Sequence, residues 1–513
     1  MIRERITNRL PLVALGVAVV WSLFLYLPWA QNYLDRADFN EFLPLLKRGR
    51  SFLESFRLVS DYYWAEGRFI PLTVAYTAAK WSAFGTWARG WQFATQALML
   101  ANVVLTYKVA RRLGASKAGS CVGSVLMIVG ASAVEAWSRV HLSEAEGTLF
   151  SLAAAYFAAD FRRDPARNRA WAALPLLVCA ILTKETFVAV APFVVLVGLT
   201  YQGDRTWTIP QLGARELKWA LLVMTSAAVA ITPALIARLT SGPSSYSAQY
   251  GSLHFAPTPF GAQVQTRFFS VANPFQEPLA DILLLGVIVA GWIVGIRRRI
   301  AGTGWVVGVA VLLSLPLAGA IVYLPWPTWA FFYGLPFALG MSVLLALACT
   351  FLIESPYAYL RTVSAAALTG AIVLMTAWAK HQSADIYARR QVVGATIDAL
   401  SAEMRTRMPV QILVPERYRG EAQTFARYAG ATHEIRFPPI HGVNCASLQS
   451  PGNSTQTSLL IDFSYLCPDT PSVTGTKIYE TSVTYRWLDF GEQPLRSSRY
   501  SGALFRVSVP LVR

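Results

Sequence analysis

The chain has 513 residues, of which 54% are hydrophobic and only 14% are charged. A soluble domain carries about 25% charged residues, so this composition indicates that lipid is the main solvent. The formal net charge is +16, but Lys and Arg gather in clusters between apolar runs. That distribution is typical of the positive-inside rule and leaves no soluble basic face, so we expect no nucleic-acid partner.

Apolar segments of about 20 residues recur from Leu10 to Trp378, which predicts a polytopic membrane protein. The first segment is too long for a signal peptide and is followed by further segments, so we interpret it as a true span. We predict about eleven spans. They lie near residues 10–30, 90–110, 118–136, 144–160, 170–183, 186–201, 217–238, 280–296, 303–324, 329–353 and 362–379.

The basic clusters set the expected orientation. They are Arg3/Arg5/Arg9, Lys108/Arg111/Arg112/Lys117, Arg162/Arg163/Arg167/Arg169, Arg205/Arg215/Lys218, Arg297/Arg298/Arg299 and Arg361. With these clusters in the cytoplasm and an odd number of spans, the N-terminus lies inside and the C-terminus outside. We therefore predict a multi-pass protein of a bacterial inner membrane, with its C-terminal domain in the periplasm.

The expected fold class is mainly α, with a transmembrane domain at 1–380 and a small α/β extracytoplasmic domain at 381–513. In the second domain, the patterns predict helices at 384–404 and 420–428 and strands at 410–414, 459–463, 476–487 and 503–512. Its two cysteines, Cys445 and Cys467, are expected to form a disulfide outside the cytoplasm. Two unpaired thiols are the alternative.

Two outer loops of the transmembrane domain are long, at 31–89 and 240–278. The first contains apolar-polar stretches at 52–64 and 69–81, which we expect to lie along the membrane interface. The second is rich in Gly, Pro, Ser and aromatic residues, a composition typical of functional or mobile loops.

Ionisable residues at the mouth of a span are energetically costly, so each outer group is a candidate for function. Asp35 and Asp38 follow the first predicted span, where a carboxylate can act as general base on an acceptor hydroxyl. Ordinary solvated loop charge is the alternative. Arg68 stands in the stretch Gly67-Arg68-Phe69-Ile70-Pro71, and its planar guanidinium suits a phosphate or a lipid headgroup equally.

Two further turns carry charge. Arg139, His141 and Glu144 precede or begin the fourth predicted span, where a carboxylate can also serve simply to stabilise the helix N-terminus. His141 has no partner at metal-ligand spacing. Lys184 and Glu185 form the turn between the fifth and sixth spans. A lysine on the outer side opposes the positive-inside trend and favours an anionic partner, with mutual neutralisation as the alternative.

In this order, the acidic first outer loop, the GRFIP stretch, the LSEAE turn and the Lys-Glu turn resemble the GT-C superfamily of membrane glycosyltransferases. The resemblance implies that Asp38 or Asp35 is the catalytic base. It also assigns donor or substrate binding to Arg68, Arg139, His141, Glu144, Lys184 and Glu185. The family context favours Asp38, although Arg36 and Ala37 separate two acids that are adjacent in many relatives.

The resemblance implies an inverting transfer of a sugar from a polyprenyl-phosphate donor to a hydroxyl of a glycan, lipid or protein acceptor. Cations around the leaving phosphate would then give the largest gain in rate, with Glu185 orienting Lys184. We expect no obligatory metal, while a divalent cation (Mg or Mn) near Asp35 and Asp38 stays open. Competing interpretations are a polysaccharide polymerase or ligase, a transporter of lipid-linked saccharides, and a receptor or scaffold.

Overall fold

The computed structural model describes residues 2–26, 43–138, 143–165, 168–210, 212–241, 278–297, 303–323, 334–406, 411–413, 457–463, 476–488 and 495–508. The chain divides into two compact units. The first unit comprises residues 1–27, 56–83 and 90–382, and the second comprises residues 28–55, 84–89 and 383–513. The domain limits expected from the sequence stay a prediction.

The first part of the chain is helical throughout. Its helices are α1 (Ile2–Tyr26), α3 (Leu43–Arg48), α4 (Phe52–Ala65), α5 (Pro71–Phe84), α6 (Ala88–Arg112), α7 (Lys117–Val129), α8 (Ala131–Ser138), α9 (Ser143–Ala158) and α10 (Asp160–Arg163). Next come the 3-10 helix η2 (Arg169–Ala172), α11 (Ala173–Thr183), the 3-10 helix η3 (Glu185–Val190) and α12 (Ala191–Thr200). A short hairpin of β1 (Tyr201–Gly203) and β2 (Thr206–Trp207) follows. The remaining helices are α13 (Ala214–Thr240), α16 (Pro278–Arg297), α17 (Thr303–Tyr323), α18 (Ala338–Ile353) and α19 (Ala358–Thr406).

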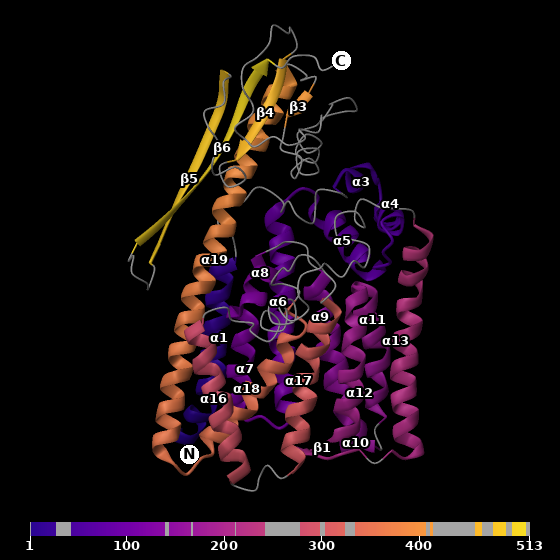
Figure 1. The fold of residues 1–513 in the computed structure, drawn as a ribbon, viewed down its shortest axis with the longest axis vertical. Helices are drawn as coiled ribbons and strands as arrows, with labels where there is room; N and C mark the ends of the chain where they lie inside the picture. Colours follow the sequence, from indigo (N-terminus) through magenta and orange to yellow (C-terminus); the bar gives the residue numbers. More distant parts are fainter. Residues whose placement is uncertain are drawn as a thin grey trace, which may run out of the picture. The chain divides into compact units, whose positions relative to one another are not determined.

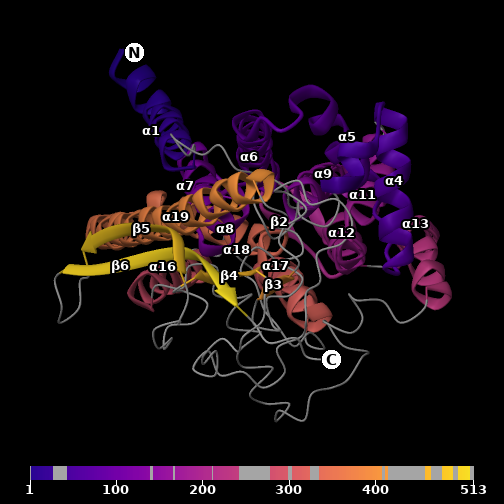
Figure 2. The same cartoon turned by 90° about the horizontal axis from the view of Figure 1, so that it is seen from above.

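The helices of the first unit pack in two groups. In one group α7 packs against α1 and α18, and α18 against α16; in the other α11 packs against α9 and α13. Helix α17 contacts both α18 and α12 and so joins the groups, as Figures 1 and 2 show from two directions. Gly119 and Gly123 permit the close approach of α7 and α18, because a Cβ on Gly119 would lie 2.2 Å from the Ala346 carbonyl oxygen.

Each predicted span coincides with helical structure among the described residues, but the number of membrane crossings stays a prediction. In the part of the chain that the structure describes, three helices are long and apolar enough to cross a membrane, at Ala88–Arg112, Ala214–Thr240 and Ala358–Ala384. Several others are shorter apolar helices of 10–17 residues. The predicted span at 118–136 is a pair of helices bent by 57°. The extended backbone of Gly130 (φ −65°, ψ 153°) ends α7 and causes the break.

The interfacial position expected for the stretches 52–64 and 69–81 stays a prediction, but the two helices that contain them differ in burial. Helix α4 does expose apolar side chains, including Leu53 and Trp64. Helix α5, however, buries Thr73, Thr77 and Lys80, so it is packed into the first unit and does not lie on its surface. The polar residues among the buried ones explain why the stretch reads as amphipathic in sequence.

The second unit contains a mixed four-stranded sheet in the order β3-β4-β6-β5. Its strands are β3 (Gln411–Leu413), β4 (Thr457–Phe463), β5 (Thr476–Leu488) and β6 (Leu495–Ser508). β3 pairs with β4 in parallel, and the other pairs are antiparallel. Four strands were predicted close to these positions, but β6 begins eight residues before the predicted 503, because it forms a hairpin with β5 along its whole length.

The helix predicted at 384–404 is not a separate element. Helix α19 runs without a break from Ala358 to Thr406, since no Gly or Pro interrupts the sequence between the last predicted span and that helix. The predicted helix at 420–428 and the cysteines Cys445 and Cys467 lie outside the described residues, so the disulfide stays a prediction.

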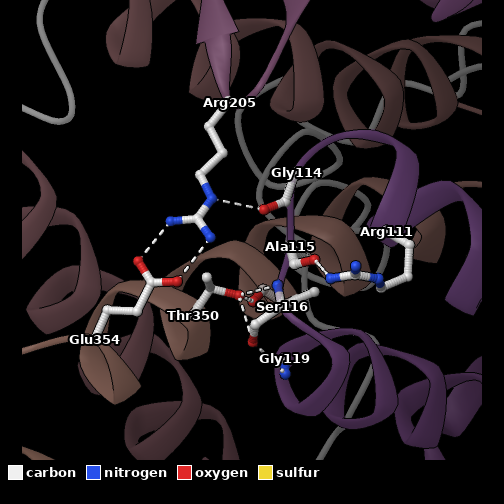
Figure 3. Close-up of polar contacts among 9 residues, drawn as sticks. Arg111, Gly114, Ala115, Ser116, Gly119, Arg205, Thr350 and Glu354 are labelled. Carbon is white, nitrogen blue, oxygen red and sulfur yellow. Dashed lines mark hydrogen bonds and ion pairs between the residues drawn. The ribbon is translucent and has the colours of Figure 1, made fainter.

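A polar junction around Arg205 ties together three elements of the first unit (Figure 3). The guanidinium donates to both carboxylate oxygens of Glu354 at 2.6 and 2.7 Å, and its Nε donates to the Gly114 carbonyl at 2.7 Å. Beside it, the backbone N–H of Ser116 donates to the Thr350 hydroxyl at 2.8 Å. The β1–β2 turn, the α6–α7 turn and the end of α18 are therefore held at one point.

The turn that carries Arg205 is strained. Asp204 and Arg205 both adopt the left-handed backbone region, with φ of 46° and 66°. This conformation costs about 1–2 kcal/mol for a residue with a Cβ and is usually given to glycine. The hydrogen bonds of the Arg205 side chain act against this backbone strain.

We predict opposite effects for glycine at the two turn positions. Asp204→Gly relieves strain and should raise the melting temperature of the purified protein or leave it unchanged. Arg205→Gly relieves the same strain but removes three charge-assisted hydrogen bonds, so we expect a net loss of about 1–2 kcal/mol. Thermal unfolding in detergent measures both. Equal shifts for the two variants would show that the junction adds no stability.

Candidate functional site

The GRFIP stretch forms the junction between α4 and α5. Gly67 has φ +73°, and its N–H donates to the Trp64 carbonyl at 2.9 Å, while the Arg68 N–H donates to the Tyr63 carbonyl at 2.8 Å. These two bonds define a Schellman motif, which requires the left-handed residue that glycine supplies. Pro71 then opens α5, the position where a missing N–H costs nothing. Gly67 and Pro71 thus shape the turn, and Arg68 is the residue that it presents.

Arg68 forms a two-point ion pair with Glu185. Its Nε and second terminal nitrogen lie 2.9 and 3.1 Å from the two carboxylate oxygens of Glu185. The two side chains are 12% and 21% exposed, so the pair is mostly shielded from water but still reachable. It joins the α4–α5 turn to the start of η3, which is 117 residues away in the sequence.

Lys184 forms a second ion pair with Glu144, in the first turn of α9. Both side chains are buried, with 6% and 1% of their surface exposed. The Ser143 hydroxyl also donates to the Glu144 carboxylate at 3.3 Å. A charge buried to this degree is tolerated only with a close partner of opposite sign, so each member of the pair requires the other.

The pairing differs from the expected one, in which Glu185 orients Lys184. The two neighbours contact different partners, Arg68 and Glu144, because Lys184 has an extended backbone (φ −160°, ψ 131°). Successive side chains of an extended segment project to opposite sides. We call the four residues Arg68, Glu144, Lys184 and Glu185 the crossed-pair cluster.

The crossed-pair cluster is electrically balanced, with two cations and two carboxylates. Burial raises the pKa of the Glu185 carboxyl, but the Arg68 guanidinium more than offsets this and holds that pKa below its usual value. Glu185 is therefore ionised at neutral pH. An incoming phosphate at Arg68 has to share or replace the Glu185 carboxylate, whereas Lys184 is committed to a buried partner.

A buried polar group that sequence reasoning did not select lies beside the cluster. The Thr73 hydroxyl is 3.0 Å from a carboxyl oxygen of Glu146 and 2.8 Å from the backbone carbonyl of Thr183. Lys80, two turns further along α5, lies over the rings of Tyr76 and Trp91 at 4.2 and 5.0 Å. Thr73 and Lys80 are seven residues apart and share one helix face. This spacing is the only signal from which the sequence could have predicted that they lie near each other.

Half of the predicted site residues lie in the described part of the chain. Arg68, Glu144, Lys184 and Glu185 are brought together, although they come from three distant segments. Asp35, Asp38, Arg139 and His141 lie outside the described residues, so their positions stay predictions. Among the described residues, no group of three or more His, Cys, Asp or Glu side chains is arranged to hold a metal ion.

No family model matches the sequence, and no curated protein matches it. In fold, the chain is similar to ArnT from Cupriavidus metallidurans in the apo state, with a TM-score of 0.52 and 12% identity over 95% of this chain and 97% of that one. It is also similar to the Archaeoglobus fulgidus oligosaccharyltransferase tethered with an acceptor peptide, with a TM-score of 0.48 and 12% identity over 89% and 69%. ArnT bound to undecaprenyl phosphate aligns with a TM-score of 0.46 and 12% identity over 96% and 97%.

Of these three structures, apo ArnT is the one with a TM-score above 0.5, and the conclusion about fold rests on it. ArnT is a membrane glycosyltransferase of the GT-C superfamily. The chain therefore has the GT-C fold that the sequence resemblance implied. At 12% identity the likeness establishes the fold alone, and the activity has to be argued from the residues.

We predict that the buried Lys184–Glu144 pair is costly to break from one side. Lys184→Met leaves the Glu144 carboxylate buried without its cation and should destabilise the protein by about 3–5 kcal/mol. Lys184→Met combined with Glu144→Gln removes both charges and should recover most of that loss. Thermal unfolding of the two single variants and the double variant measures the coupling.

The exposed pair Arg57–Asp61 is a matched control, since its side chains are 83% and 69% exposed at a distance of 3.7 Å. Arg57→Met, Asp61→Asn and their combination should all leave the melting temperature nearly unchanged. Additive losses for Lys184 and Glu144 would contradict the assignment of a coupled buried pair.

Proposed function

We propose that this chain is a membrane glycosyltransferase that moves a sugar from a polyprenyl-phosphate-linked donor to an acceptor hydroxyl. The observation that carries the proposal is the crossed-pair cluster, in which a partly accessible arginine is held in a fixed orientation inside a GT-C fold. An arginine held at two points is already ordered before a phosphate arrives, and that phosphate would share or replace the Glu185 carboxylate.

The position of the cluster in the first unit supports this proposal. Glu144 begins α9 and Lys184 ends α11, so both lie at the same end of the helices, together with the α4–α5 turn. The β1–β2 hairpin and α10 lie at the opposite end, as Figure 1 shows, and Arg205 of this hairpin donates to the Gly114 carbonyl just after Arg111 and Arg112 at the end of α6. Since the basic end faces the cytoplasm by the positive-inside rule, the cluster faces the outer side, where a lipid-linked donor is displayed.

The proposed reaction uses a carboxylate of the first outer loop as general base. Asp38, or Asp35, takes the proton from the acceptor hydroxyl while the hydroxyl oxygen attacks the anomeric carbon. The bond from that carbon to the phosphate oxygen breaks, and the polyprenyl phosphate leaves with the electron pair. Attack from the opposite side inverts the anomeric carbon. Arg68 stabilises the charge that gathers on the leaving phosphate.

The remaining assignments are part of the same proposal. Arg139 and His141, which precede α9 in the sequence, are assigned to donor binding together with Glu144. The acceptor is a hydroxyl of a glycan, a lipid or a protein, and the protein acts in a bacterial inner membrane with its C-terminal unit in the periplasm. We expect no obligatory metal, because the leaving group is a phosphate met by cationic side chains, while a divalent cation (Mg or Mn) near Asp35 and Asp38 stays open.

Arg68→Lys tests the donor site. Lysine keeps the charge but cannot form the two-point contact, so we expect polyprenyl phosphate to bind the purified protein about 10-fold more weakly. Transfer should fall by about 10–100-fold. Arg57→Lys, in α4 and exposed, is the matched control and should behave as the parent. Equal binding by the parent and the Arg68 variant would place the donor phosphate elsewhere.

Asp38→Asn and Asp35→Asn test the base. One of them should lower transfer by at least about 100-fold while donor binding is retained, because the amide cannot accept the hydroxyl proton. Asp61→Asn, an exposed acid in α4, controls for the loss of a surface carboxylate. Sugar transfer from a radiolabelled polyprenyl-phosphate donor in membranes containing each variant provides the measurement. Full activity in both variants and in the double variant would exclude the general-base assignment.

A further inference from the structure

Thr73 occupies a buried position between two segments that the candidate site depends on. It lies two residues after Pro71, in the first turn of α5, and is 2% exposed. On one side is Glu146, two residues after Glu144 in α9. On the other is the backbone carbonyl of Thr183, the residue directly before Lys184. We call Thr73, Glu146 and the Thr183 carbonyl the Thr73 bridge.

The packing around the bridge leaves little room for adjustment. A Cβ on Gly147 would lie 2.3 Å from the ring of Phe187 and 2.5 Å from the Thr183 hydroxyl. Helix α9 therefore touches the Lys184–Glu185 turn directly, and glycine is required beside Glu146 for that approach. Thr183 and Glu146 are 1% and 5% exposed, so no bulk water reaches these polar atoms.

The number of hydrogens in the bridge determines the protonation state of Glu146. The Thr73 hydroxyl has a single hydrogen, but two oxygens lie within bonding distance, at 3.0 and 2.8 Å. The Thr183 carbonyl can only accept, and an ionised carboxylate can also only accept. If Glu146 were ionised, one of these buried oxygen pairs would face each other without a hydrogen, which is unfavourable. A protonated Glu146 removes the conflict, because it donates to Thr73 and Thr73 donates to Thr183.

We propose that Glu146 is held as a neutral carboxylic acid, and that the chain Glu146–Thr73–Thr183 fixes the Lys184–Glu185 turn against α5. Helix α5 begins directly after the Arg68 turn. By holding α5 against the Lys184–Glu185 turn, the bridge therefore sets the distance between Arg68 and Glu185. Thr73 and Glu146 are then positioning residues, which act on the donor through the crossed-pair cluster. This functional consequence rests on the function proposed above, whereas the bridge itself does not.

The charged and titratable groups around Glu146 come from three elements. Lys80 and Tyr76 belong to α5, Glu144 to α9, and Lys184 to the turn after α11. Glu144 disfavours a second negative charge two residues away, while Lys80 favours one. An ionised Glu146 that compensates Lys80 is therefore the competing state, and the experiment has to separate the two.

Glu146→Gln separates them directly. An amide donates to Thr73 as the neutral acid does, so the melting temperature should stay close to that of the parent. An ionised Glu146 would instead make Glu146→Gln strongly destabilising, and Lys80→Met would relieve that loss in the double variant. In infrared difference spectra, the parent should show the carbonyl stretch of a protonated carboxylic acid that Glu146→Gln lacks. Absence of this band would overturn the proposal.

Thr73 variants test the link to the donor. Thr73→Val keeps the shape but cannot bond either partner, so the KM for a polyprenyl-phosphate sugar donor should rise about 10-fold, with a smaller change in kcat. Thr73→Ser should restore it to within about 2-fold. Thr106→Val is the matched control, because Thr106 is equally buried and its hydroxyl donates to its own helix, to the Asn102 carbonyl at 2.9 Å.

The two proposals fail in distinguishable ways. If the protein binds and uses no polyprenyl-phosphate donor at all, the proposed function is wrong, while the infrared band and the Glu146→Gln melting temperature still decide the bridge. If the parent uses the donor and Thr73→Val lowers the melting temperature without changing KM, the positioning role is wrong and the proposed function stands.

Discussion

The arrangement of the candidate site depends on charge compensation in a place that water barely reaches. Lys184 and Glu144 are buried almost completely, and an isolated charge there would cost several kcal/mol. Each of the two cations therefore pairs with a carboxylate from a distant segment, and these ion pairs bring three segments to one end of the fold. The α4–α5 turn, the first turn of α9 and the turn after α11 meet because Arg68 needs Glu185 and Lys184 needs Glu144. Of the two cations in the cluster, Arg68 is the less buried, so it is better able to exchange its carboxylate partner for a phosphate.

At the other end of the first unit, the Arg205 junction solves a different problem with the same chemistry. Arg205 accepts a left-handed backbone so that its guanidinium can bind Glu354 and the Gly114 carbonyl together. The pair is partly exposed, so its contribution is modest and serves to hold loops in place. The two ends thus differ: one holds the β1–β2 turn, the α6–α7 turn and the end of α18 together, and the other keeps the Arg68 guanidinium partly exposed.

The sequence predicted the helices well, because lipid-facing segments need long apolar runs and each predicted span coincides with helical structure. It failed at breaks and continuities that depend on single residues. Gly130 divides one predicted span. By contrast, no Gly or Pro lies between Trp378 and the helix predicted at 384–404, so α19 continues through both. Four site residues could be selected from the sequence, because an ionisable side chain at the mouth of a span is energetically costly. Which residue pairs with which could not be predicted. The partner of Glu185 depends on the backbone angles of Lys184. Nothing in the sequence distinguishes Thr73 from other threonines, because its contacts arise only when α9 and α11 pack beside it.

Because the backbone at Lys184 is extended, the order of Lys184 and Glu185 in the sequence determines which partner each residue contacts. Because Lys184 and Glu185 project to opposite sides, exchanging them would place a lysine against Arg68 and a glutamate against Glu144, so both contacts would become repulsive. Lys-Glu is therefore a directional signature, and Glu-Lys at this turn would mark a chain whose opposing residues have changed sign as well. Distant relatives are better recognised by this coupled pattern of signs across Arg68, Glu144 and the turn than by the identity of any one residue.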